Sequence, residues 1–155
     1  MSNQPTMAEH FGWQFHPFSD TWRIDPPFYS QRDQRLADQA LQLLQYGKSF
    51  AVTGPSGAGK STLVEHLLSN LDANYYLKVH IHYGGLQRNA LLTAIGEQLG
   101  VETNRRAVPL LVKLQKHIAA IATAKQSVHP VIVVDDAQLL ARESLMDLCS
   151  LIVCP

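Results

Sequence analysis

Residues 53–62, TGPSGAGKST, combine three glycines, a lysine and several hydroxyl side chains in ten positions. Eight of them, 54–61, fit the pattern G-x-x-x-x-G-K-[ST] throughout, between an apolar run and a helical pattern. Glycines let the backbone curl so that successive N–H groups point inward at the start of a helix, where they bind anions. An ordinary glycine-rich turn is the alternative. We predict that the phosphates of a nucleotide are bound by Gly54, Pro55, Ser56, Gly57, Ala58, Gly59, Lys60, Ser61 and Thr62.

Two side chains of this loop have predicted chemical roles. Lys60 would reach the β- and γ-phosphates as a point charge and so take part in catalysis. The hydroxyl of Ser61 would bind Mg²⁺, which prefers oxygen ligands.

A second motif, VIVVDDAQ, places two carboxylates directly after four β-branched residues. A phosphate loop needs a carboxylate at the end of a neighbouring strand to hold the magnesium, and Asp135 fits that place. Asp136 follows it and is the candidate base for an attacking water. The alternative is that the aspartates cap the start of a helix.

The remaining pattern describes the elements that must position these motifs. Residues 75–83 alternate between apolar and polar side chains, which predicts a strand at the edge of a sheet with one face in solvent. The apolar run 49–53 predicts a buried strand, and the apolar run before Asp135 predicts a central strand that is covered on both faces. Helical spacing separates them, which predicts a parallel α/β sheet. The expected strands cover 49–53, 75–83 and the run before Asp135, and the expected helices cover 33–46, 60–71, 88–100, 108–126 and the segment after 141.

Composition narrows the class of protein. The 155 residues are 46% hydrophobic with no net charge, which indicates a globular domain and argues against a polybasic nucleic-acid binder. Two cysteines, Cys149 and Cys154, are too few for a disulfide framework. The sequence shows no signal peptide and no apolar run that would span a membrane, so we expect a cytoplasmic protein.

Two smaller groups admit more than one interpretation. His80 and His82 share one face of the predicted edge strand and could bind a metal, although a solvent-facing pair is the simpler account. Arg105 and Arg106 form a basic point that could touch DNA or a neighbouring subunit, although simple solvation is favoured.

Taken together, HFGWQFHPFSD, YGKSFAVTGPSGAGKST, RNALLTAIGEQLG and VIVVDDAQLL resemble the AAA+ ATPases of the ExeA and TniB type. The resemblance implies a P-loop NTPase fold, a three-layer αβα sandwich with a parallel sheet, that uses ATP and Mg²⁺. The prolines in the first thirty residues interrupt any helix there and predict an extended aromatic and proline-rich arm over residues 1–30. The resemblance implies that His16, Pro17 and Phe18 of this arm lie near the adenine and that 31–155 form the N-terminal part of an ATPase core.

The chain departs from this family pattern in two ways. Asp136 stands where the family usually has a glutamate, so the carboxylate is one methylene shorter and hydrolysis is expected to be slow. The family continues with a further strand, a sensor residue, an arginine finger and a helical lid. We therefore expect an incomplete core that is truncated at its C-terminus.

The resemblance implies an ATPase whose full-length form assembles as a homo-oligomer on double-stranded DNA and regulates a transposase or recombinase. The ATPase of a secretion or envelope-assembly system is the alternative within the same fold. A small P-loop kinase is disfavoured because such kinases open with the phosphate loop, whereas here an arm and a helix precede it. A nucleotide-binding protein that does not hydrolyse ATP also remains open.

Overall fold

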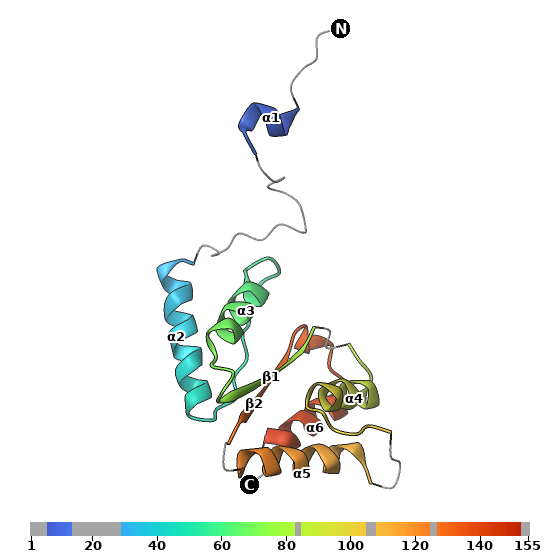
Figure 1. The fold of residues 1–155 in the computed structure, drawn as a ribbon. Helices are drawn as coiled ribbons and strands as arrows, with labels where there is room; N and C mark the ends of the chain where they lie inside the picture. The colour runs from blue at the N-terminus through green and yellow to red at the C-terminus, as the bar shows by residue number, and fades with distance from the viewer. Residues whose placement is uncertain (1–5, 14–28, 83–84, 105–107, 125–126, 153–155) are drawn as a thin grey trace. The chain divides into compact units, whose positions relative to one another are not determined.

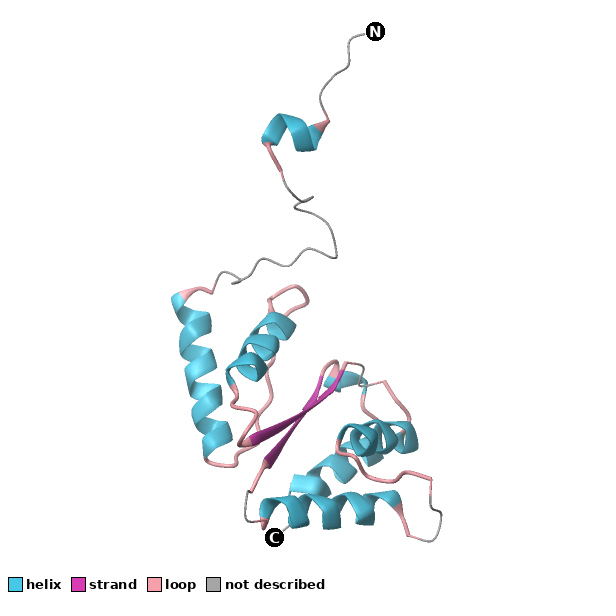
Figure 2. Ribbon diagram, viewed as in Figure 1, coloured by secondary structure: helices cyan, strands magenta, loops and turns pink. Residues whose placement is uncertain are grey.

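The computed structural model describes residues 6–13, 29–82, 85–104, 108–124 and 127–152. The chain divides into two units, 1–36 and 37–155. Their helices and strands, shown in Figures 1 and 2, are α1 (Met7–Phe11), α2 (Gln31–Gln45), α3 (Lys60–Asn70), β1 (Tyr76–Ile81), α4 (Arg88–Gln98), α5 (Leu110–Ala122), β2 (His129–Val134), the 3₁₀ turn η1 (Ala137–Leu139) and α6 (Arg142–Ile152).

The first unit begins with a capped helix. Thr6 and Glu9 form a capping box at the start of α1, and Gly12 ends it with a φ of 65°. The expectation of an extended arm is therefore wrong for residues 7–11, because this capping signal precedes the prolines that were expected to break the helix. His16, Pro17 and Phe18 lie outside the described residues.

The strands β1 and β2 form a parallel two-stranded sheet, as the sequence predicts. Their register runs from Tyr76 opposite His129 to Ile81 opposite Val134. Gln98 covers the other edge of β1: its amide oxygen accepts the His80 N–H at 2.9 Å, and its amide nitrogen donates to the His80 carbonyl at 3.0 Å. A side chain thus satisfies backbone groups that an edge strand would otherwise leave open.

The main hydrophobic core lies where α4, α5 and α6 pack with the sheet (Figure 1). Val79 and Ile81 enter it from β1, on the apolar face that the alternating sequence predicts. Its side chains with no exposed surface include Leu91, Ile95 and Leu114. Burying each aliphatic side chain contributes about 1.5–3 kcal/mol, so this cluster holds the helices against the sheet.

A smaller cluster joins α2 to α3. Ala37 and Ala40 are buried on α2, and they pack with Leu67 of α3. Helix α2 ends at Gln45, and Gly47 follows with a φ of 62°, the left-handed conformation that is common just after a helix. Helix α3 is thus held by packing against α2 as well as by the loop before it.

Two predictions about strands are wrong. Residues 49–53 form no strand, and Phe50 is 37% exposed. A strand needs a neighbour for its backbone hydrogen bonds, and among the described residues only β1 and β2 pair. The run before Asp135 is not a central strand covered on both faces, because β2 pairs only with β1 in this part of the chain and its apolar residues are half-buried.

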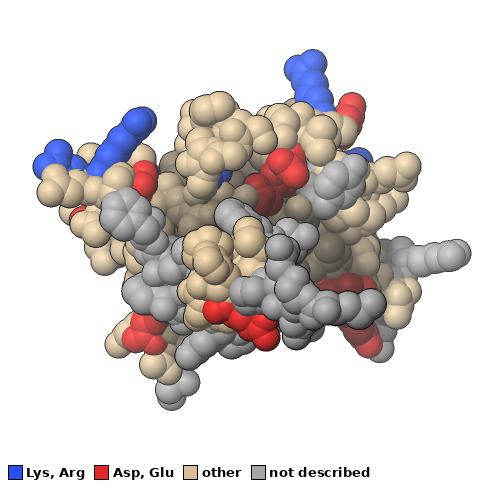
Figure 3. Space-filling view, turned by 90° about the horizontal axis from the view of Figure 1, so that it is seen from above, with Lys and Arg blue, Asp and Glu red and all other residues tan. Residues whose placement is uncertain are grey.

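No helix in the described segments is long and apolar enough to cross a membrane. Figure 3 shows one face of the molecule, on which acidic and basic side chains both occur. This mixture agrees with the absence of net charge in the sequence.

Candidate functional site: the loop before α3 and the end of β2

The loop before α3 has the backbone that its glycines predict. Gly57 and Gly59 have φ values of 75° and 80°, a conformation that a residue with a Cβ atom rarely adopts. Gly59 is the N-cap of α3, and the first intrahelical bond runs from the Leu63 N–H to the Gly59 carbonyl at 2.9 Å. The amide groups of the first helical turn have no intrahelical acceptor and can bind an anion.

Lys60 is held within the loop that precedes it. Its Nζ donates to the carbonyl oxygens of Gly54 at 3.2 Å and Pro55 at 2.9 Å. Both acceptors are neutral carbonyls, so a phosphate oxygen could replace them as a stronger, charge-assisted acceptor. The loop therefore keeps a cation among the amides that form the predicted phosphate site.

Ser61 and Asp135, 74 positions apart in sequence, meet at this site. The Ser61 hydroxyl donates to Oδ2 of Asp135 at 2.8 Å. This bond lowers the pKa of Asp135 below its ordinary value of 3.8, while partial burial opposes the shift. The Asp135 N–H donates to the Ile81 carbonyl at 2.8 Å and so continues the β1–β2 ladder. The carboxylate stays ionised at neutral pH, where it can attract a cation.

The two oxygen atoms of this pair suit magnesium. Mg²⁺ is bound through one or two protein oxygens together with substrate phosphates and water. The Ser61 hydroxyl and the Asp135 carboxylate, which are in hydrogen-bond contact, supply two such protein oxygens beside the loop. No group of three or more histidine, cysteine, aspartate or glutamate side chains within the described segments could hold a metal by itself.

Asp136 has the most unusual backbone of the site. Its φ of 51° and ψ of 38° are left-handed, and no other non-glycine residue among those described has a positive φ. It precedes η1, but its side chain makes no capping hydrogen bond, so the alternative interpretation as a helix cap does not account for it. Its carboxylate instead accepts the side-chain amide of Gln138 at 3.0 Å.

His80 of β1 and His82, which follows the strand, lie beside this site. The ring centroids of His80 and His82 are 3.9 Å apart, and Nε2 of His80 is buried with no hydrogen-bond partner among the residues that the structure describes. Burial lowers the pKa of His80, and His82 adds to the shift, while Asp135 and Glu65 oppose it. Only His82 is exposed, so the prediction of a pair that faces solvent is wrong for His80, which is half-buried.

The structure thus gathers most of the predicted site residues at one place. Lys60 and Ser61 begin α3, Thr62 lies exposed in the same turn, and Asp135 and Asp136 follow β2. Gln138 is a member that the sequence analysis missed, and its only signal was its place two residues after Asp136. Arg105 and Arg106 lie outside the described residues.

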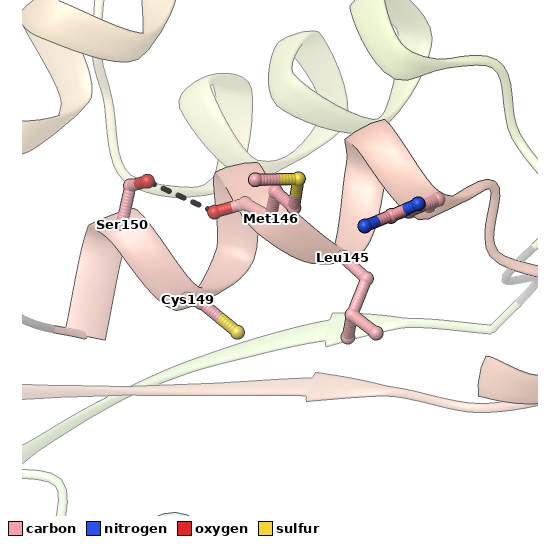
Figure 4. A pocket seen from close by; sticks show the side chains of 5 residues that line it. Leu145, Met146, Cys149 and Ser150 are labelled. Carbon is pink, nitrogen blue, oxygen red and sulfur yellow. Dashed lines mark hydrogen bonds between the residues drawn. The ribbon is translucent and has the colours of Figure 1, made fainter.

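Two hollows elsewhere contain none of the predicted phosphate-site residues. One lies on α6 and is lined by Arg142, Leu145, Met146, Cys149 and Ser150, as Figure 4 shows. Its surface is mainly apolar, and Cys149 is a free, exposed thiol. The other lies where the loop after α4 approaches α5, and Lys113, Lys116 and His117 are among its lining residues.

Comparison with known proteins adds one finding. A family model described as an AAA domain matches residues 42–154, which include the phosphate loop, both strands and the two aspartates. No curated protein and no solved structure matches the chain.

Proposed function

The chain belongs to the AAA-domain family, and from that premise we propose that it binds ATP with Mg²⁺ at the loop before α3 and hydrolyses it slowly. Membership of the family indicates a nucleotide-binding ATPase with a P-loop α/β fold. The observation that carries the proposal for this chain is the contact between Ser61 and Asp135, which joins the loop to the end of β2 at 2.8 Å.

Each proposed role follows from the chemistry of the group. The loop Gly54–Thr62 offers backbone amides to the phosphates, and Lys60 neutralises their charge. Ser61 and Asp135 would hold the magnesium, which neutralises phosphate charge when it is bound. Asp136 is the candidate base, and its short side chain is the reason that we expect slow turnover.

Titration calorimetry with ATP and Mg²⁺ tests the binding site. Lys60→Ala should weaken ATP binding roughly 10- to 100-fold, because a charge-assisted bond to phosphate is lost. Lys48→Ala is the matched control, since Lys48 is an exposed lysine outside the loop, and it should leave the affinity unchanged. Equal affinities for the wild type and Lys60→Ala would refute the site.

Hydrolysis is measured separately, under single-turnover conditions with radiolabelled ATP. Slow release of phosphate that Asp136→Asn lowers strongly, to a residual rate, would support an ATPase. Tight binding without any release would instead support the alternative of a nucleotide-binding protein that does not hydrolyse ATP. Transfer of the phosphoryl group to a small acceptor would favour a kinase.

We further propose, from the resemblance to the ExeA and TniB type, that the protein assembles as a homo-oligomer on double-stranded DNA and acts with a transposase or recombinase. One observation supports a polyanionic partner: α5 carries Lys113, Lys116 and His117 and has no acidic residue. Lys116 and His117 lie three and four positions after Lys113, hence on one face of the helix.

The salt dependence of DNA binding tests this partner. Lys116→Gln should weaken binding to DNA of any sequence and lower the slope of log K against log salt by about 1, because one phosphate contact is lost. Lys78→Gln, an exposed lysine on β1, is the control. An unchanged slope for Lys116→Gln would show that this face of α5 does not contact DNA. If the protein binds no DNA at all, the alternative role in secretion would be favoured.

A further inference from the structure

The geometry around Asp136 suggests that its carboxylate is held in place by its neighbours. A left-handed backbone is unfavourable for a residue with a Cβ atom, although aspartate tolerates it better than most. Asp136 adopts it at the end of β2, directly after the residue that contacts the phosphate loop. Because Asp136 lies after β2 and has left-handed backbone angles, the direction of its side chain is set by this turn and does not follow the alternation of the strand.

Three hydrogen bonds fix the surroundings of this side chain. The Ser61 hydroxyl donates to Oδ2 of Asp135 at 2.8 Å, and the Asp136 N–H donates to Oδ1 of Asp135 at 3.0 Å. The Gln138 amide then donates to Oδ1 of Asp136 at 3.0 Å. These bonds connect the start of α3, the end of β2 and η1 in one series. Oδ2 of Asp136 has no hydrogen-bond donor among the described residues and is available to a water molecule.

We propose that Gln138 is a positioning residue, whose amide holds one carboxylate oxygen of Asp136 so that the other can accept a proton from the attacking water. The inference rests on the proposed ATPase function and deepens it. In the reaction, the water oxygen bonds to the γ-phosphorus and its proton passes to Asp136. The bond from that phosphorus to the β–γ bridging oxygen breaks, and its electron pair leaves with ADP.

The exposure of Gln138 is the reason that we assign its hydrogen bond with Asp136 to catalysis and not to the stability of the fold. Both Gln138 and Asp136 are exposed, and a hydrogen bond between exposed groups adds little to the stability of a fold. The same bond can have a large effect on catalysis, since a base must lie within hydrogen-bond reach of its water. A carboxylate one methylene shorter than glutamate has less freedom to find that position unaided.

The test compares two variants of Gln138 by single-turnover hydrolysis. Gln138→Ala removes the donor and should lower the rate about 10-fold, with the affinity for ATP unchanged. Gln138→Glu keeps the size of the side chain but faces Asp136 with a second carboxylate, so it should lower the rate more than Gln138→Ala does. A role in packing alone predicts the opposite order. Gln42→Ala and Gln42→Glu, at an exposed position of α2, are the matched controls.

A double-mutant cycle shows whether Gln138 acts through Asp136. In an Asp136→Asn background the side chain is no longer an anionic base, so Gln138→Ala should cause no further loss. Additive losses would overturn the proposal. A structural readout needs no nucleotide: in the ligand-free protein, the side-chain amide resonance of Gln138 should shift in Asp136→Ala and stay in place in Asp38→Ala.

The outcomes separate this inference from the function on which it rests. Failure to bind ATP would refute both. Hydrolysis that is equal in the wild type, Gln138→Ala and Gln138→Glu would refute only the role of Gln138. ATP binding without hydrolysis would overturn the role as well, because Asp136 would then activate no water.

Discussion

The left-handed backbone at Asp136 predicts an unusual order of stabilities for substitutions at that position. Glycine adopts φ and ψ values of 51° and 38° without steric conflict, whereas a β-branched residue is strongly disfavoured there. Asp136→Gly should therefore be more stable than Asp136→Val. Both variants lose the same hydrogen bond from Gln138, so that loss cancels in the comparison.

The expected difference follows from two opposing terms. The left-handed conformation costs a residue with a Cβ atom about 1–2 kcal/mol, and valine lies at the upper end because it is branched at Cβ. Glycine loses about 0.5–1 kcal/mol through the greater freedom of its unfolded chain. Asp136→Gly should thus exceed Asp136→Val by about 1 kcal/mol in the free energy of unfolding. For a chain of this size, that difference corresponds to a Tm difference of about 2–4 °C.

Thermal unfolding without nucleotide measures this difference, and Asp38 provides the control. Asp38 is exposed within α2, where the backbone is helical and glycine is less favourable than valine by a few tenths of a kcal/mol. The order should therefore reverse between the two sites. If Asp136→Val melts at or above Asp136→Gly, the left-handed geometry and the reasoning built on it are refuted.

Two further predictions concern the core and the site. Leu114→Ala should lower the free energy of unfolding by about 3 kcal/mol, because Leu114 has no exposed surface, whereas Leu145→Ala, at a side chain that is 52% exposed, should change it by less than about 0.5 kcal/mol. Urea titration measures both, and equal losses would contradict the packing of α5. Ser61→Ala removes the hydrogen bond that lowers the pKa of Asp135 in the folded protein. The stability that this bond contributes is fully present above pH 3.8, the ordinary pKa, and is lost as the pH falls through the lower pKa of the folded state. The stability gap between wild type and Ser61→Ala should therefore narrow in acid, and a constant gap would contradict this linkage.

The sequence by itself determined the features that depend on local chemistry. The glycine pattern predicted the loop before α3, the alternation in 75–83 predicted β1 with its apolar face, and a β-branched run predicted β2. Helical spacing likewise predicted α2 to α6 with small errors at their ends. Each of these features follows from the conformational preferences of the residues and from the pattern of apolar side chains, and a short segment of sequence is enough to show both properties.

Only the tertiary structure decided the features that need two distant segments. Residues 49–53 have the composition of a strand but form none, because no strand among the described residues pairs with them through backbone hydrogen bonds. The contact between Ser61 and Asp135 requires the start of α3 to lie beside the end of β2. The left-handed turn at Asp136 depends on the bonds that surround it, and the role proposed for Gln138 depends on that turn. Local preferences select the elements, whereas hydrogen-bond partners and burial, which only the folded chain supplies, select the geometry of the site.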